Sequence, residues 1–301
     1  MQTEKPIQQP SKDVYKLVTD RIIEQLEKGT VPWQRPWRLA GVPKNAITGR
    51  PYRGFNALYL SSLGYEQNLF LTFSQVNKEL GGKVKQGEHG HVITWWKTEK
   101  PKDEEEQIDG KARLYLRYYT VFNVSQCEGL PEKYRLPQQE EIELPACKDI
   151  VANMPLCPPI THKGPSAFYH PIDDFVNMPK RNSFKSDAAY YSVLFHELVH
   201  STGHHLRLRR KGLIEMSEFG SDQYSFEELV AEIGTCFLQS VTGIESEFPN
   251  SAAYISGWLA VLKSDKRFIL TASAAAQKAV DFILNMPAET EEAEVIEEME
   301  G

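Results

Sequence analysis

Apolar residues recur at helical spacing near the start of the chain. Residues 11–29 predict an amphipathic helix that Gly29 ends, with one face formed by Val14, Leu17, Val18, Ile22, Ile23 and Leu26. Shorter apolar patterns predict helices at 55–63 and 73–80. The segment before them, 31–54, is rich in Pro, Gly, Trp and Arg, which predicts an ordered loop.

The pattern then changes to the alternation that is typical of strands. Residues 91–98, HVITWWKT, and 114–125, LYLRYYTVFNVS, predict a hairpin whose strands are separated by a charged loop. On the second strand we expect Leu114, Leu116, Tyr118, Phe122 and Val124 on one face. The other face then carries Tyr115, Arg117 and Tyr119.

Helical spacing returns in the back half of the chain. Short extended runs are expected at 166–179, before a helix at 186–202 that Gly203 ends. A second helix is expected after Ser225, with one apolar face formed by Phe226, Leu229, Val230, Ile233 and Phe237. Two further helices are predicted at 252–263 and 266–285.

The length of 301 residues and a break in periodicity predict an α+β protein of two domains. Residues 128–155 are rich in Pro and Glu and show little periodicity, so the linker is placed at 131–155. We expect a small mixed α/β domain at 1–130 and a mainly helical domain with a short sheet at 156–287. The last segment, 288–301, holds seven Glu and no base and is expected to be a disordered acidic tail.

Charge is distributed unevenly between the two halves. Residues 1–126 hold 19 Lys and Arg against 14 Asp and Glu, a balance of +5, whereas the remainder holds 15 against 27, a balance of −12. Such an asymmetry indicates different partners for the two halves. A polyanion could bind the front half, and the back half would repel it.

The composition also narrows the cellular setting. No apolar run approaches the roughly 20 residues that span a bilayer. The first residues are polar rather than a secretory signal, and the four cysteines form no CxxC pair. We therefore expect a cytoplasmic protein with reduced thiols and no membrane partner.

The sequence HELVH at 196–200 lies inside the predicted helix 186–202. His196 and His200 are four residues apart, so they share a helical face and can bind one metal ion. Glu197 lies slightly off that axis, where it can act as the catalytic base. This HExxH arrangement is typical of zinc peptidases; the alternative is two histidines on a half-buried face.

A third ligand is expected from the second helix. Glu228 and Glu232 are four residues apart in YSFEELVAEIG (224–234), which resembles the pattern of glutamate-type zincins. By that resemblance Glu228 binds the metal and Glu232 buttresses a ligand histidine. Two alternatives stay open: Ser225 and Glu228 form a capping box, or Glu227 is the ligand.

The segment after HELVH offers further candidates. HExxHxxG matches the metzincins through Gly203, but position 206, where a third histidine would fall, is Leu206. Tyr224, His204 and His205 are candidate oxyanion donors, and the alternative for the two histidines is a helix C-cap. The run RLRRK (207–211) is expected to be a solvated basic patch.

The front half interleaves aromatic and basic residues. Rings stack on bases while cations follow phosphates, which is the chemistry of single-strand binding. The alternative is that the aromatics are core residues and the cations are scattered. The candidates are Trp33, Arg35, Trp37, Arg38, Arg50, Tyr52, Arg53, Lys83, Lys85, Trp95, Trp96, Lys97, Arg117 and Tyr119.

Segments along nearly the whole chain resemble the ArdC-type antirestriction proteins of plasmids and mobile elements. In front these are VPWQRPW (31–37), TGRPYRGFNALYL (48–60), GGKVKQGEHG (81–90) and YYTVFNVSQCEGL (118–130). Behind they are FYHPIDDFVNMP (168–179), YYSVLFHELVHSTGH (190–204) and YSFEELVAEIG (224–234). The resemblance implies an N-terminal domain that binds single-stranded DNA and a C-terminal zincin-like metallopeptidase domain.

The resemblance also implies protection of incoming mobile-element DNA from host restriction. We expect Zn²⁺ as the cofactor, although Mn²⁺ or Co²⁺ suits the same ligands. The expected partners are single-stranded DNA and a protein substrate, such as a restriction subunit or another DNA-bound protein. The alternative is a non-proteolytic coat for single-stranded DNA, with a structural or vestigial metal site.

Overall fold

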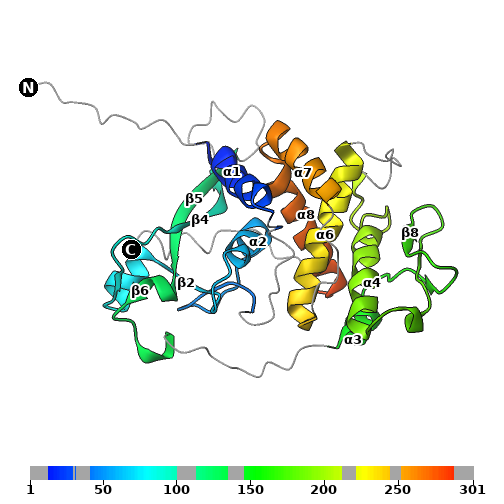
Figure 1. The fold of residues 1–301 in the computed structure, drawn as a ribbon, viewed down its shortest axis with the longest axis horizontal. Coiled ribbons are helices and arrows are strands. Elements are labelled where there is room, and N and C mark those ends of the chain that lie inside the picture. Colours follow the sequence, from blue (N-terminus) through cyan, green and yellow to red (C-terminus); the bar gives the residue numbers. More distant parts are fainter. Residues whose placement is uncertain are drawn as a thin grey trace, which may run out of the picture.

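The computed structural model describes residues 13–29, 31, 41–99, 113–134, 146–211, 222–244 and 252–287 (Figure 1). Several predictions lie outside these residues: the acidic tail and the candidates Trp33, Arg35, Trp37 and Arg38. The side chains of Trp96 and Lys97 also lie outside the description, although their backbone does not. Within the described ranges, no helix combines the length and apolar character that crossing a bilayer requires.

The front half is a mixed sheet with helices on one face. Its four strands are β1 (Lys44–Asn45), β2 (Leu69–Thr72), β4 (His91–Glu99) and β5 (Arg113–Asn123), in the order β1-β2-β5-β4. The predicted hairpin is confirmed, since β4 and β5 pair antiparallel from His91↔Val121 to Glu99↔Arg113. The predicted first helix is α1 (Val14–Glu27), and Asp13 caps it by accepting a hydrogen bond from the Lys16 amide at 3.1 Å.

Three shorter elements complete this half. Helix α2 (Gly54–Ser62) and a π-helical turn at Gln75–Glu79 occupy the two positions predicted to be helical. A second, two-stranded sheet pairs β3 (Lys83–Val84) with β6 (Cys127–Glu128). Its side chains join a small apolar cluster with Leu71 and Val76 of the main sheet region.

The predicted faces of β5 are partly wrong. Tyr119, predicted on the face available for stacking, packs against the main core, and the neighbouring Val121 on that face is fully buried. Tyr118, predicted on the opposite face, is 40% exposed. Alternation shows which side chains share a face, but the helices packed on a sheet decide which face is covered.

The back half is mainly helical. Its helices are α3 (Cys147–Asn153), α4 (Asp187–Thr202), α6 (Asp222–Thr242), α7 (Ala252–Ser264) and α8 (Phe268–Ile283). A short sheet of β7 (Ile160–Thr161), β8 (Phe168–His170) and β9 (Phe175–Asn177) lies beside α4, in the order β7-β9-β8 (Figure 1). The elements agree with the predicted ranges, and the α+β class is confirmed.

One core runs through both halves. Leu58 of α2 and Phe70 of β2 belong to the same buried cluster as Phe195 of α4 and Ile269 of α8. Helices α1 and α2 lie against α7 and α8 (Figure 1). Polar contacts reinforce this junction: the Thr19 hydroxyl donates to the Lys266 carbonyl at 2.7 Å.

The junction also uses a partly buried ion pair, between Arg53 at the start of α2 and Asp281 on α8. The Gly54 amide donates to the Gln277 side chain at 3.0 Å beside it. The predicted boundaries, with a linker at 131–155, remain a prediction. Within that range, helix α3 contributes Ile150 to the shared core.

Candidate metal centre

Helix α4 carries the two histidines of the HELVH motif. Ser186 caps its first turn, accepting a hydrogen bond from the Ala189 amide at 3.0 Å, and ten of its residues are buried. His196 and His200 lie one turn apart on the same face, and their Nε2 atoms are 3.1 Å apart. Both side chains are 12% exposed, so a bound ion would be largely shielded from solvent.

Helix α6 brings Glu228 to these histidines. Its Oε2 lies 3.6 Å from His196 Nε2, and its Oε1 lies 3.6 Å from His200 Nε2. Because α6 begins at Asp222, Ser225 lies inside the helix, which excludes the capping-box alternative for Glu228. A glycine allows the close approach of the two helices: a Cβ on Gly234 would lie 2.9 Å from both γ-carbons of Val199.

The donor set fits a divalent metal ion. Across the described residues, His196, His200 and Glu228 form a group whose ligand atoms lie within 4.8 Å of one another. Two ligands about 2.0–2.1 Å from a tetrahedral Zn²⁺ lie roughly 3.3 Å apart. The separations of 3.1 and 3.6 Å are close to that edge, with one oxygen of Glu228 near His196 and the other near His200.

Glu227 contacts His200 on the side of its ring that faces away from Glu228. Its Oε1 lies 3.6 Å from His200 Nδ1, the ring nitrogen that does not face Glu228. The Arg210 guanidinium donates to both carboxylate oxygens of Glu227, at 2.5 Å from Nη2 and 3.0 Å from Nε. Arg210 is itself fixed by Thr202 Oγ1 at 2.6 Å and the Val199 carbonyl at 2.8 Å. Outer contacts of this kind orient a ligand histidine.

The prediction of a solvated patch at RLRRK is wrong in part: Arg209 and Lys211 are exposed, but Arg207 and Arg210 are engaged with other residues. The Arg210 side chain is 10% exposed and that of Arg207 only 1%. Arg207 pairs with Asp174 and donates to the Ser201 carbonyl at 2.6 Å and the Leu156 carbonyl at 3.0 Å. The sequence shows two adjacent carboxylates, Glu227 and Glu228, that can take different roles beside a metal ion. No local pattern indicates that Arg210 pairs with Glu227.

The electrostatics keep the carboxylates charged. Burial opposes ionisation of Glu227, but His200 and Arg210 lower the pKa of its carboxyl to about 2. Burial likewise opposes ionisation of Glu228, while His196, His200 and a hydrogen bond from Tyr224 lower its pKa. Burial would lower the pKa of His196, yet Glu228, Glu197 and Glu232 together raise it. The centre is therefore a negative site that favours a cation.

The remaining predicted site residues take different positions. Glu197 is 8% exposed. Glu232 is close enough to raise the pKa of His196. Tyr224 contacts Glu228 through its hydroxyl. His204 is buried with Nδ1 3.7 Å from Asp174 Oδ2, and the exposed His205 lies against it with ring centroids 4.1 Å apart. Of the three candidate oxyanion donors, Tyr224 is the one seen to contact a ligand.

The described DNA-binding candidates divide into free and engaged side chains. Arg50 and Arg117 are exposed and have no ion pair among the described residues. Trp95 is half-buried and pairs across the strands with Arg117. Tyr52 and Tyr119 pack on the core, and burial raises the pKa of Tyr119 to about 12.

Three basic candidates already have partners. Arg53 pairs with Asp281 of α8, so its guanidinium serves the junction between the halves rather than an open surface. Lys83 pairs with Glu128 at 3.1 Å, and Lys85 donates to the Ser125 carbonyl at 2.7 Å, although both side chains are exposed.

Comparison with known families defines the class of protein. A family described as "Zincin-like metallopeptidase" matches residues 147–275, the helices and sheet that hold the metal centre. The "N-terminal domain of anti-restriction factor ArdC" matches residues 12–122, the sheet and helices of the front half. The chain is thus a two-domain protein that joins an ArdC-type N-terminal domain to a zincin-like domain.

The chain belongs to the ArdC antirestriction family. It is 38% identical to the antirestriction ArdC protein of plasmid R388, with a TM-score of 0.74 over 91% of this chain and 99% of that one. A second structure of that protein, described as Mn(II)-bound, superposes with a TM-score of 0.73. The uncharacterized protein y4eC of Sinorhizobium fredii (strain NBRC 101917 / NGR234) is 34% identical over 94% of this chain and 95% of its own length.

Two longer relatives contain a similar region. Two Escherichia coli proteins named DNA primase TraC are 32% and 34% identical over 92% and 91% of this chain. The chain spans only 20% and 27% of their lengths. Their name therefore describes proteins that are several times longer than the matched region.

Proposed function

We propose that this chain is an antirestriction protein that binds single-stranded DNA and carries a zinc metallopeptidase-type centre. The observation that supports the peptidase half is the triangle of His196 Nε2, His200 Nε2 and a Glu228 oxygen, with the buried Glu197 beside it. A purely structural zinc site usually has four protein ligands and needs no base. Three ligands and an adjacent carboxylate suit hydrolysis.

Each residue of the centre has a distinct part in the proposed reaction. A divalent ion held by His196, His200 and Glu228 would supply Lewis-acid chemistry. Glu197 would accept a proton from the attacking water and pass it to the leaving amine. Glu227 and Arg210 keep His200 in its orientation, and Tyr224 holds Glu228 and remains a candidate oxyanion donor, with His204 and His205 as alternatives. Zn²⁺ is the proposed ion; Mn²⁺ and Co²⁺ suit the same ligands.

Replacing Glu197 by Gln tests the peptidase function. The variant should keep its metal but lose hydrolysis of an unfolded protein such as casein, by at least about 100-fold. Asp187→Asn is the matched control, because it makes the same carboxylate-to-amide change in the exposed first turn of the same helix. Equal hydrolysis by Glu197→Gln and wild type would show that Glu197 is not the base.

The same variant tests whether proteolysis serves antirestriction. We propose that the chain acts in the cytoplasm on a restriction subunit or another protein bound to DNA. Unmodified plasmid DNA would be transferred into a restricting host that carries wild type, Glu197→Gln or Asp187→Asn. Protection that survives in Glu197→Gln would favour the alternative, in which a non-proteolytic coat on single-stranded DNA protects it.

The proposed DNA function is supported by Arg50 and Arg117, which have no ion pair among the described residues, and by the half-buried Trp95 that lies opposite Arg117. Affinity should be higher for single strands than for duplex and should fall steeply with salt. Arg117→Ala should weaken binding a few-fold and lower the salt slope by nearly one. Lys78→Ala removes another exposed cation as a control. A salt-independent affinity would contradict phosphate binding.

A further inference from the structure

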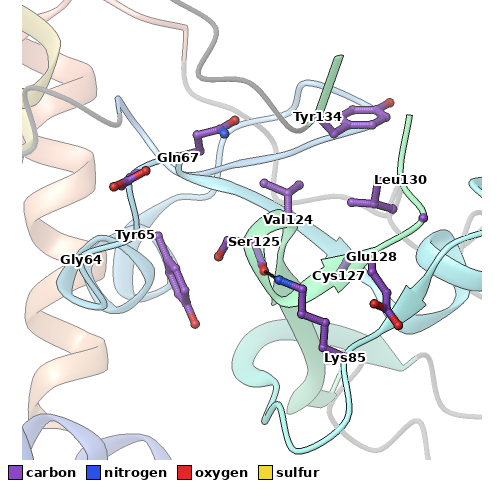
Figure 2. Close-up of a pocket in the computed structure, with 12 residues that line it drawn as sticks. Gly64, Tyr65, Gln67, Lys85, Val124, Ser125, Cys127, Glu128, Leu130 and Tyr134 are labelled. Carbon is purple, nitrogen blue, oxygen red and sulfur yellow. Dashed lines mark hydrogen bonds between the residues drawn. The ribbon is translucent and has the colours of Figure 1, made fainter. Parts of the chain in front are cut away.

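The front half contains a pocket that neither the metal centre nor the proposed arginine contacts use. Its volume is about 670 Å³, and it opens between the loop after α2, the end of β3 and the segment around β6. Tyr65 and Gln67 lie on one side, Leu130 and Tyr134 on another, and Val124 and Ser125 between them (Figure 2). Ligand pockets in proteins typically measure about 300–1,000 Å³, so the space suits a group the size of a nucleotide.

The aromatic side chains of the pocket are held in place. The Tyr65 hydroxyl is 2.7 Å from His91 Nε2, and its ring makes edge contacts with His91 and Phe70. Tyr134 is 6% exposed and belongs to the small apolar cluster. The half-buried Tyr65 ring, fixed in this way, can accept a stacked planar group without losing further conformational freedom.

The polar groups of the pocket also have defined positions. The Lys85 ammonium is anchored at the Ser125 carbonyl, at 2.7 Å, on the edge of the pocket (Figure 2). The Gln67 backbone carbonyl accepts from Asn123 Nδ2 at 2.7 Å, which fixes the loop. The Gln67 side-chain oxygen Oε1 is buried and has no hydrogen-bond partner among the described residues. Because that atom has almost no accessible surface, a ligand in the pocket would meet the Tyr65 ring and the Lys85 ammonium rather than this oxygen.

Two carboxylates limit what the pocket can take. Glu66 and Glu128 also line it, and Glu128 is paired with Lys83 at 3.1 Å. Their charge disfavours a phosphate inside the pocket, whereas an uncharged planar ring with N–H donors suits it. A phosphate joined to such a ring would find the Lys85 ammonium at the edge.

We propose that this pocket takes a nucleobase of single-stranded DNA, with Tyr65 as the stacking surface and Lys85 next to the flanking phosphate. The proposal rests on the proposed DNA-binding function of the front half and assigns a site within it. Every base has a π-face, so a stacking site of this kind discriminates little among sequences.

Photocrosslinking on the wild-type chain tests the site without any variant. A single-stranded oligonucleotide that carries 5-iodouracil would be irradiated with the full chain, and the attached residue mapped by mass spectrometry. Attachment at Tyr65 or Tyr134 is the expected result. Attachment only elsewhere, or none despite measurable binding, would overturn the proposal.

Affinity measurements on variants give a second, independent test. Tyr65→Leu should weaken single-strand binding by about tenfold, and Lys85→Ala by a few-fold. Lys78→Ala, an exposed lysine outside the pocket, is the matched control and should bind as wild type does. Thermal melting verifies that each variant is folded.

The outcomes separate this site from the function on which it rests. If wild type binds single strands and Tyr65→Leu and Lys85→Ala bind equally well, the pocket is not the base site but the DNA-binding function stands. If wild type does not bind single strands even at low salt, both the function and the pocket proposal fail.

Discussion

The metal centre and the front-half surface are built in contrasting ways. The candidate metal centre concentrates its chemistry in two helices, with three candidate ligand atoms from α4 and α6 within 4.8 Å of one another. The front half spreads its cations and rings over several loops and strands, and some of them are already engaged, as Arg53 is with Asp281. Metal coordination requires a few atoms in a fixed geometry, whereas single-strand binding adds many weak contacts along a surface.

This difference has a consequence for substitutions. Replacing one of the three candidate metal ligands removes a donor atom that no neighbouring residue replaces. Loss of one arginine from a distributed surface leaves the remaining contacts in place. We therefore expect all-or-none effects at the centre and graded effects in the front half, with the shared core joining the two.

The largest effect is expected at the third ligand. Glu228→Ala should lower metal affinity by at least about 100-fold, because two histidines alone leave the ion poorly held. Metal content of the purified chain, by mass spectrometry, measures this directly. Arg210→Ala, which takes from the buried Glu227 the cation that fixes it beside His200, should lower metal affinity by about 10- to 100-fold. Unchanged metal content in Glu228→Ala would shift the ligand role to Glu227 or to another residue.

The next effect is expected where α6 crosses α4. Gly234→Ala would place a methyl group 2.9 Å from both γ-carbons of Val199, and should destabilise the fold by about 1–3 kcal/mol. Gly257→Ala is the matched control: no atom lies within 4 Å of a Cβ there, so it should stabilise α7 by up to about 1 kcal/mol. Chemical denaturation would compare the free energies of unfolding of Gly234→Ala and Gly257→Ala. Similar curves for both variants would mean that the helices do not depend on this close contact.

A smaller effect tests the junction between the halves. Arg53→Ala leaves the partly buried Asp281 without its cation and should cost about 1–2 kcal/mol. Arg21→Ala, which breaks an exposed pair with Glu24, should change stability by less than about 0.5 kcal/mol. In Arg53→Ala, hydrogen exchange should show weaker protection of the backbone amides in both α2 and α8. Loss confined to α2 would indicate that the halves are not coupled through this pair.

The last effect, no larger than that of Arg53→Ala, concerns the acid stability of the front half. Burial lowers the pKa of His91 from its usual 6.5 to about 4, so the unfolded chain binds this proton more readily. Above pH 6.5 His91 is neutral in both states and does not reduce the free energy of unfolding. As the pH falls towards 4, the free energy of unfolding decreases by about 1–2 kcal/mol after allowance for solvent screening. His91→Gln should flatten the stability profile in that window. An unchanged slope would assign the acid sensitivity to other groups.

Local patterns predicted most of the elements and part of the centre. Period-2 alternation located the β4–β5 hairpin, and the spacing of His196 and His200 on one helix placed both imidazoles together. Glu228 followed from the resemblance of the second helix to a known pattern, and the structure brings it to the histidines. These features depend on neighbours within a few residues in the chain, which is why the sequence reveals them.

Other features depend on contacts between distant segments. The adjacent Glu227 and Glu228 are chemically equivalent in the sequence, and the rotation of α6 against α4 decides which one meets both histidines. The return of Arg210 to Glu227, the pairing of Arg53 with Asp281 and the covering of Tyr119 have the same origin. Local patterns were therefore enough to place the helices, the hairpin and the two histidines, since each depends on residues close together in the chain. How carboxylates, arginines and aromatic faces are shared between the candidate metal centre, the core and the open surface depends on packing between distant segments, which local patterns do not encode.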